Sequence, residues 1–171
     1  MTTKDLFEEK NKRLLELQAQ PSCCRIEVAV DFDQHWLGDL KRSGFDASAN
    51  TLWIVEGLLF FLKTEQVDNL LKTLKEASSR GSRFVTDMPS KSLLNAPTSL
   101  IFLSKLRNDG YPWQFGSDNP EGFLQMNGWK VTKIKEPGEK GVGEKRWPYT
   151  VQDRSIIGVS RNWLICASLD S

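Results

Sequence analysis

The sequence predicts an α/β fold with a parallel sheet and right-handed crossover connections. Short runs rich in β-branched and apolar residues alternate with segments of helical periodicity along most of the chain. One of these runs is apolar on both faces, as a buried parallel strand would be. No internal repeat and no linker rich in Pro, Gly and Ser divides the 171 residues. A chain of this length can bury a single core without disulfides or metal.

A helix, a strand and a second helix are expected in the N-terminal quarter. Strong helix formers fill residues 4–18, and Pro21 ends that helix. Residues 25–32 (RIEVAVDF) are short, apolar and β-branched with a polar end, which is typical of a strand. Residues 34–43 then form a short helix, closed by Gly44 at the position after its C-cap.

The middle of the chain continues the alternation. Residues 51–55 (TLWIV) are the strand that is apolar on both faces. Thr64 can cap a helix whose apolar positions follow the i, i+3, i+4, i+7 pattern without a miss. These positions are Val67, Leu70, Leu71 and Leu74. Residues 83–87 (RFVTD) form the next strand.

Two helices and two strands are expected in the last part of the chain. One helix covers residues 98–108 and stops at Gly110, and another lies within residues 119–128, with Asn119 as its cap and a proline in its first turn. Residues 129–135 and 162–167 are strands separated by a long loop, which suggests an antiparallel pair at the sheet edge.

Composition excludes several function classes. The chain has 23 Lys+Arg against 22 Asp+Glu and no basic stripe, so a nucleic-acid partner is not expected. Its single His removes Ser-His-Asp triads and multi-His zinc sites, and its three cysteines form neither a disulfide framework nor a CxxC metal pair. Without a long apolar window or an apolar signal segment, we expect a cytoplasmic protein with no membrane partner and no metal site.

Two carboxylates stand where an open α/β sheet binds ligands, outside the carboxyl ends of its strands. Asp31 ends the first predicted strand and Glu56 follows the second. Glu56 interrupts the otherwise apolar run of residues 53–62, and since an unpaired buried carboxylate is costly, a partner is expected beside it. Gly57 would let a ligand approach closely, or could be an ordinary turn glycine. The alternative, of equal weight, is that each carboxylate only accepts local backbone N–H groups.

The order and spacing of several segments resemble the leucine carboxyl methyltransferase family. These segments are VAVDF (28–32), the WL-to-GFD stretch (36–46), TLWIVEGLLFFL (51–62), FGSDNPEGFLQMNGW (115–129) and SRNWLICA (160–167). The family includes protein-phosphatase carboxyl methyltransferases and many S-adenosylmethionine-dependent O-methyltransferases. The resemblance covers about residues 25–168.

This resemblance implies an enzyme with a Rossmann-like class I methyltransferase sheet, strand order 3-2-1-4-5-7-6, the last strand antiparallel and helices on both faces. It implies S-adenosylmethionine as the cofactor, with Asp31 and Phe32 contacting its adenine end and Glu56 contacting it after the fourth strand. The acceptor would be a carboxylate or hydroxyl oxygen of a small molecule or a protein. No catalytic residue is implied, because a carboxylate acceptor is already ionised at neutral pH.

Measured against the family, the chain lacks the first two strands and the glycine-rich cofactor loop. Residues 1–171 are therefore expected to form one incomplete domain, with the helix of residues 4–18 and strands three to seven. The strand of residues 25–32 would have no neighbour and the strand of residues 51–55 an open edge, so this truncated form is expected to bind the cofactor poorly and to have impaired activity alone.

Three alternatives concern what these open strands and the acceptor pocket do. The chain could be a non-catalytic interaction module that pairs its strands with a partner or a second copy. Residues 25–32 could instead pack directly beside residues 51–55. Residues 88–116 could close the acceptor pocket, with Trp113 and Phe115 either as its walls or as core residues.

Overall fold

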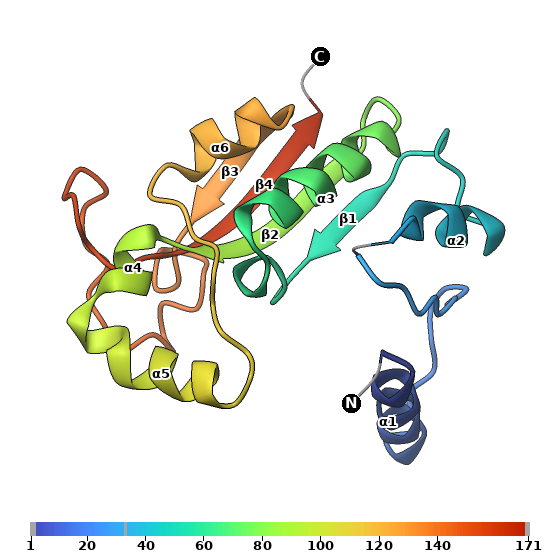
Figure 1. Cartoon of the computed structure of the whole chain (residues 1–171), viewed down its shortest axis with the longest axis horizontal. Coiled ribbons are helices and arrows are strands. Elements are labelled where there is room, and N and C mark those ends of the chain that lie inside the picture. Colours follow the sequence, from blue (N-terminus) through green and yellow to red (C-terminus); the bar gives the residue numbers. More distant parts are fainter. Residues whose placement is uncertain (1–2, 33, 170–171) are drawn as a thin grey trace. The chain divides into compact units, whose positions relative to one another are not determined.

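The structure is a computed structural model that describes residues 3–32 and 34–169 (Figure 1). The chain divides into two compact units, Met1–Asp46 and Ala47–Ser171. The smaller unit holds two helices, and the larger one holds the sheet with the remaining helices.

The smaller unit contains both predicted helices, α1 (Thr3–Glu16) and α2 (Trp36–Arg42). The strand predicted over residues 25–32 is wrong, because these residues are irregular and mostly exposed. A strand needs a neighbour for its backbone N–H and C=O groups. Among the described residues, residues 25–32 form no ladder, and the side chains of Arg25 and Glu27 form an ion pair with each other.

The larger unit contains a four-stranded sheet in the order β1-β2-β4-β3 (Figure 1). Its strands are β1 (Leu52–Val55), β2 (Arg83–Pro89), β3 (Trp129–Lys135) and β4 (Asn162–Leu169). Strands β1 and β2 are parallel, whereas β4 runs antiparallel to both of its neighbours. This is the 4-5-7-6 part of the order that the resemblance implies. Among the described residues the ladder partner of β1 is β2, and residues 25–32 do not form the strand that the alternative of packing beside β1 requires.

Helices α3 (Thr64–Glu76) and α6 (Pro120–Met126) form where the apolar pattern predicts them. The N-cap of α3 is Lys63 rather than Thr64. The backbone N–H of Lys63 donates to Gln66 Oε1 at 2.9 Å. Asn119 caps α6 as predicted, because its side-chain oxygen accepts the Gly122 N–H at 3.0 Å.

Several short helical segments follow β1 and β2. They are η1 (Leu59–Phe61), α4 (Lys91–Asn95), η2 (Pro97–Ser99) and α5 (Leu100–Asn108). Helix α5 forms where the sequence predicts it, whereas α4 was not predicted. Helix α4 begins at Ser90, whose hydroxyl oxygen accepts the Leu93 N–H at 3.0 Å. In Figure 1, α4 and α5 lie at the end of the sheet where β2 finishes.

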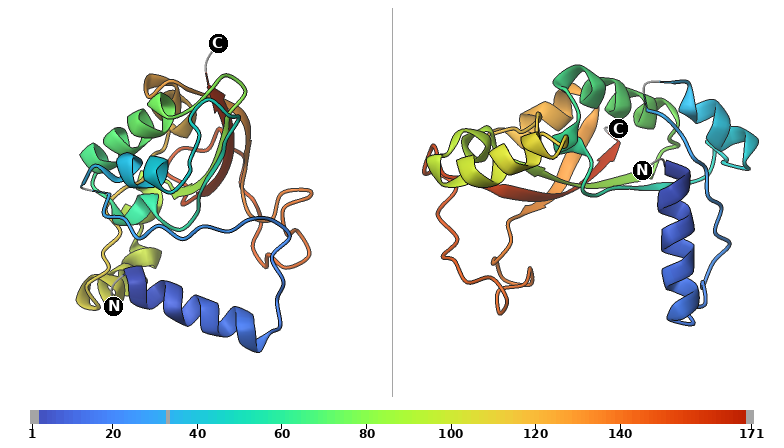
Figure 2. Two further views of the ribbon diagram at one scale, coloured as in Figure 1. Left: turned by 90° about the vertical axis from the view of Figure 1, so that its right-hand side faces the viewer. Right: turned by 60° about the horizontal axis from the view of Figure 1, so that its bottom comes forward.

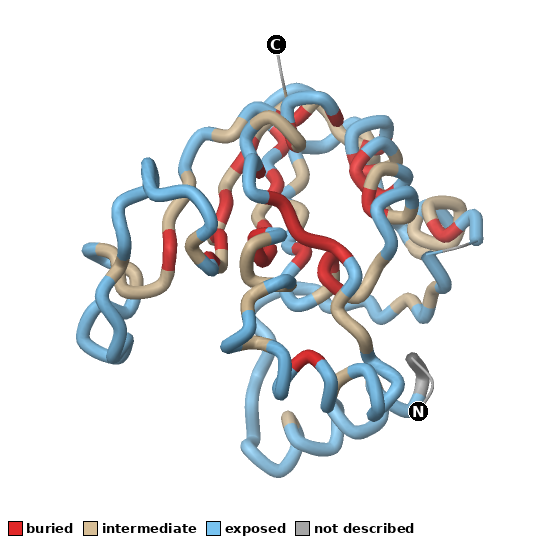
Figure 3. Tube along the Cα trace, turned by 60° about the vertical axis from the view of Figure 1, so that its left-hand side comes forward, coloured by how far each residue is buried: buried red, intermediate tan, exposed pale blue. Residues whose placement is uncertain are grey.

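The core lies between one face of the sheet and helices α3 and α6 (Figures 2 and 3). Trp129 is fully buried there; its indole N–H donates to the Leu71 carbonyl at 3.1 Å and its ring lies 5.3 Å from that of Phe84. The opposite face is only half-covered: Leu52 and Ile54 are 56% and 64% exposed. Strand alternation therefore separates a buried face from an accessible one.

Candidate functional site

Two acidic side chains meet at the carboxyl end of the sheet. Glu56 directly follows β1 and Asp87 lies near the end of β2, and since the two strands are parallel these ends share one edge. The backbone N–H of Gly57 donates to Asp87 Oδ1 at 2.8 Å, and Gly57 has a φ of +68°, a conformation that glycine adopts without strain. The Thr86 hydroxyl donates to the Val55 carbonyl at 2.8 Å and ties the two strand ends together.

The Glu56 carboxylate is accessible rather than buried. Because water can solvate this carboxylate, Glu56 does not require the protein partner that the sequence led us to expect. The carboxylate forms no hydrogen bond or ion pair with another described residue. Glu56 follows the strand whose Ile54 is also exposed, so the two side chains share the accessible face of the sheet. Glu56 and Asp87 line a hollow of about 360 Å³ whose other walls include Ile54 and the lysines Lys133 and Lys135. This arrangement leaves carboxylate oxygens available to a ligand's amino or hydroxyl groups.

Asp87 is the site residue that the sequence analysis does not single out, although it is the last residue of a predicted strand. The signal that picks out Asp31 and Glu56, a carboxylate at a strand end, applies to it equally.

Asp31 and Phe32 lie in the smaller unit, apart in the chain from Glu56. The Asp31 carbonyl accepts the Gln34 N–H at 3.0 Å. Phe32 is 43% exposed and meets Trp36 edge to face with ring centres 5.6 Å apart. Their assignment to one cofactor site with Glu56 stays a prediction.

Trp113 and Phe115 pack among other aromatic rings. Phe115 is 3% exposed, with its ring 5.0 Å from that of Phe123. Trp113 lies 4.3 Å from Phe60 and 5.4 Å from Phe102, measured between ring centres. Of the two roles considered for these residues, core packing is the one that these contacts support.

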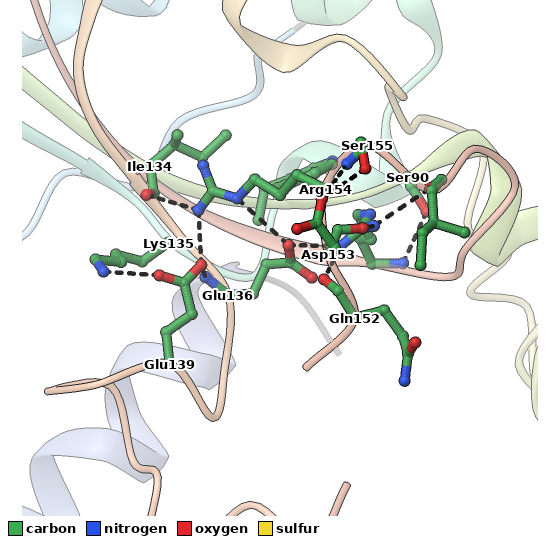
Figure 4. Close-up of polar contacts among 12 residues, drawn as sticks. Ser90, Ile134, Lys135, Glu136, Glu139, Gln152, Asp153, Arg154 and Ser155 are labelled. Carbon is green, nitrogen blue, oxygen red and sulfur yellow. Dashed lines mark hydrogen bonds and ion pairs between the residues drawn. The ribbon is translucent and has the colours of Figure 1, made fainter. Parts of the chain in front are cut away.

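A buried ion pair holds the loop between β3 and β4, residues 136–160 (Figure 4). Arg161 Nη1 donates to Glu136 Oε1 at 2.8 Å, and the two side chains are only 5% and 8% exposed. The Nη1 and Nη2 groups of Arg161 also donate to three backbone carbonyls of the loop. These bonds go to Gln152 at 3.0 Å, Asp153 at 2.5 Å and Ile156 at 3.3 Å.

Arg161 also joins the loop to Ser90, the N-cap of α4. The Arg161 backbone N–H donates to Ser90 Oγ at 2.9 Å, and the Ser90 N–H donates to the Arg161 carbonyl at 2.9 Å. The guanidinium of Arg161 also lies 5.7 Å from the ring centre of Trp163. Neither Glu136 nor Arg161 is identified in the sequence analysis, since nothing in their local patterns links residues 25 positions apart.

A second cluster of charges surrounds Glu139. Desolvation raises the pKa of the Glu139 carboxyl, but the hydrogen bonds from Lys135, Arg154 and the Glu136 N–H outweigh it and leave the pKa below its ordinary value of 4.5. The contacts are 2.7 Å to Lys135 Nζ, 2.7 Å to Arg154 Nη2 and 3.1 Å to the Glu136 nitrogen.

The free energy of unfolding should therefore fall in acid. Because folding lowers the pKa of Glu139, its contribution is complete above pH 4.5 and is lost as pH falls through the folded-state pKa. Carboxyl carbon NMR shifts of Glu139 should titrate with a midpoint below 4.5, and Lys135→Met should raise this midpoint. The matched control Lys130→Met, on the same strand, should leave it unchanged; a wild-type midpoint at or above 4.5 contradicts the expectation.

The described residues contain no group of three or more His, Cys, Asp or Glu side chains that could hold a metal ion. Among the described helices, none has the length and apolar character needed to cross a membrane.

Comparison with known proteins finds a methyltransferase family and similar bacterial proteins. Residues 3–75 match the model for leucine carboxyl methyltransferases. Two Mycolicibacterium smegmatis proteins, provisionally assigned as S-adenosyl-L-methionine-dependent methyltransferases, are 31% identical over 140 residues and 42% identical over 134 residues. Over the matched residues the chain is similar to the leucine carboxyl methyltransferase family. The aligned regions cover 77% and 74% of this chain and 46% and 45% of the two relatives, so the chain spans about half their length.

Solved structures confirm the methyltransferase fold of this chain. A provisionally assigned methyltransferase from Thermobifida fusca matches with a TM-score of 0.59 and 16% identity. The magnesium protoporphyrin IX methyltransferase of Synechocystis, solved with S-adenosylhomocysteine bound, matches with a TM-score of 0.52 and 15% identity. Each match covers 95% of this chain and 59% of the other. At such low identity the likeness establishes the fold alone.

Proposed function

We propose that these residues belong to an S-adenosylmethionine-dependent O-methyltransferase that transfers a methyl group to a carboxylate or hydroxyl oxygen. The observation that carries the proposal is the placement of Glu56 at the carboxyl end of β1, next to Asp87, in a sheet with the 4-5-7-6 strand order. The family match and the names of the M. smegmatis relatives support it. Because the chain spans about half of those relatives, we propose that the 171 residues alone bind the cofactor weakly and have little activity.

The acidic edge fits such a cofactor. S-Adenosylmethionine supplies a methyl group activated by a positively charged sulfonium, and its ribose and adenine carry hydroxyl and amino donors. Glu56 has accessible carboxylate oxygens without a partner among the described residues, so it can accept hydrogen bonds from such donors. Asp31 and Phe32 are proposed to contact the adenine end, although they lie in the other unit.

The reaction needs positioning more than proton transfer. The acceptor oxygen forms a bond to the methyl carbon while the carbon–sulfur bond breaks and its electron pair stays on sulfur. A carboxylate acceptor reacts without a general base, whereas a hydroxyl acceptor loses its proton to solvent or to a base. We therefore assign Glu56 and Asp87 to binding, and we expect most of the rate enhancement to come from aligning the two reactants.

The mutation Glu56→Gln should weaken cofactor binding about tenfold, because it removes a charged acceptor worth roughly 1.5 kcal/mol. Amide NMR spectra of the 171-residue chain, titrated with S-adenosylmethionine, measure even weak binding residue by residue. In the wild type the amides of Glu56, Gly57 and Asp87 should shift.

The matched control is Glu121→Gln, which removes an exposed carboxylate from α6. Binding should be unchanged in this variant. If the wild-type amides at the carboxyl edge do not shift at any cofactor concentration, the site assignment is wrong. Micromolar affinity of the isolated chain would instead contradict the proposal that it binds weakly.

A second candidate function is favoured by the open edge of β1. Among the described residues, β2 is the ladder partner on one side of β1, and the other side has none. Leu52 and Ile54 project from this strand with more than half of their surface exposed. We propose as the alternative that β1 pairs with β1 of a second copy about a two-fold axis through Trp53, which sets Leu52 of each copy opposite Ile54 of the other.

Light scattering coupled to size exclusion tests this alternative. A self-paired protein should have twice the 19.5 kDa mass of the chain. Ile54→Lys places a charge at the pairing edge and should restore the monomer, whereas the control Ile101→Lys, at a position 88% exposed on α5, should not. A wild type that elutes as a folded monomer at all concentrations refutes self-pairing.

A further inference from the structure

A second cavity, distinct from the hollow beside Glu56, lies in the larger unit where the β3–β4 loop meets η2. Its volume is about 490 Å³, within the range of small-molecule sites. Strand β3 is parallel to β1 and β2, because both β2 and β3 run antiparallel to β4. The loop that leaves β3 and the segment that leaves β2 therefore lie at the same carboxyl edge as Glu56 (Figure 1). The uncharged residues that line this second cavity include Thr98, Ser99, Trp147, Tyr149, Val151 and Ser160.

The charges of this cavity are already neutralised. Glu136 and Arg161 are the two charged residues among its described lining, and they pair with each other at 2.8 Å. The remaining contacts of the Arg161 guanidinium go to three loop carbonyls, as described above. No cation is therefore left to pair with an incoming carboxylate, and burying a carboxylate without a partner is costly.

What the cavity does offer is aromatic surface and neutral hydroxyl groups. Trp147 and Tyr149 are 40% and 70% exposed and meet edge to face, with ring centres 5.4 Å apart. Trp147 also packs closely over Gly138: a Cβ atom there would lie 2.4 Å from Trp147 Cδ1. Flat rings bind favourably against such aromatic faces, and hydroxyl side chains can both donate and accept hydrogen bonds.

We propose that this cavity binds an uncharged aromatic molecule with a hydroxyl group, a phenol, as the methyl acceptor. The inference rests on the proposed methyltransferase function and chooses between its two acceptor classes. It selects a hydroxyl oxygen over a carboxylate, because the lining provides stacking surfaces and neutral hydrogen-bonding groups but no unpaired cation.

Titration with two matched probes tests the choice. At about pH 7, 2-naphthol is uncharged and 2-naphthoate is ionised, although both carry the same ring system. Amide and indole N–H NMR signals of the 171-residue chain report where each probe binds. We expect 2-naphthol to shift the signals of Trp147, Ser99 and Val151, and 2-naphthoate to bind at least tenfold more weakly. Equal or tighter binding of 2-naphthoate, or no shift with either probe, overturns the proposal.

Variants locate the binding. Tyr149→Ala should weaken 2-naphthol binding at least fivefold, and Gly138→Ala should weaken it as well by displacing the Trp147 ring. The control is Tyr111→Ala, which removes the chain's other tyrosine, 62% exposed and outside the cavity lining. An equal effect of Tyr111→Ala and Tyr149→Ala also overturns the proposal.

These titrations contain no cofactor, so the two proposals fail separately. If 2-naphthol binds at Trp147 while S-adenosylmethionine shifts no amide at Glu56, the phenol cavity stands and the methyltransferase site is wrong. If the cofactor binds and neither naphthalene probe does, the acceptor assignment is wrong and the methyltransferase site stands.

Discussion

Replacing Arg161 with methionine should lower the free energy of unfolding by about 3–5 kcal/mol. The reason is the Glu136 carboxylate, which is 8% exposed and would lose its 2.8 Å partner inside the protein. Arg154 Nε lies 3.6 Å from the same carboxylate and is too exposed, at 40%, to replace that partner fully. Three loop carbonyls would also lose their donors. Urea unfolding monitored by tryptophan fluorescence measures the loss.

Two companion variants show whether the buried pair is the cause. Arg13→Met breaks two ion pairs, to Glu9 and Glu16, whose arginine is 67% exposed, and it should change the free energy of unfolding by less than about 1 kcal/mol. The double variant Arg161→Met with Glu136→Leu should be more stable than Arg161→Met alone, because no buried charge is left without a partner. Equal stability of the Arg161→Met variant and the wild type would contradict the expectation.

Trp129→Ala should lower the free energy of unfolding by about 3–5 kcal/mol as well, through the cavity it leaves. Trp129 is fully buried and links three elements: it starts β3, its ring packs against Phe84 of β2, and its indole N–H donates to the Leu71 carbonyl of α3. Thermal and urea unfolding measure the effect.

Trp129→Phe separates the two contributions, because it keeps much of the ring volume and removes the 3.1 Å hydrogen bond. Its loss should be smaller than that of Trp129→Ala. Trp147→Ala serves as the control, since this tryptophan is 40% exposed and lies in the loop outside the sheet core. A loss from Trp147→Ala as large as that from Trp129→Ala would show that burial does not set the cost.

The strands of the sheet and its main helices could be predicted because the residue pattern that specifies each one lies within its own segment of the sequence. Helix α3 has an unbroken apolar stripe, and residues 129–135 were predicted as a strand with the bounds that the structure shows. Residues 25–32 have the same strand-like composition, but strand formation depends on a neighbour that no local pattern reveals. The five-residue helix α4 was missed because it depends on one hydroxyl, that of Ser90, rather than on periodicity.

The candidate site was predictable to a similar extent. Strand-end position finds Glu56, and the same rule would have found Asp87. The burial of Glu56 was wrongly predicted, because its apolar neighbours alternate between a covered and an accessible face of the sheet. The pairing of Glu136 with Arg161 could not be predicted, since it joins residues that only the antiparallel β3–β4 arrangement brings together.

The ion pair between Glu136 and Arg161 has an evolutionary consequence. It joins the first residue of the β3–β4 loop to the residue that follows the loop, so the strands stay anchored whatever lies between. The entropic cost of closing a loop rises slowly with its length, by about 0.6 kcal/mol for each doubling. Insertions, deletions and substitutions in the middle of this loop can therefore reshape the second cavity without disturbing the sheet. New ligand preferences could therefore evolve through changes in residues 137–160 alone, while the sheet keeps its fold.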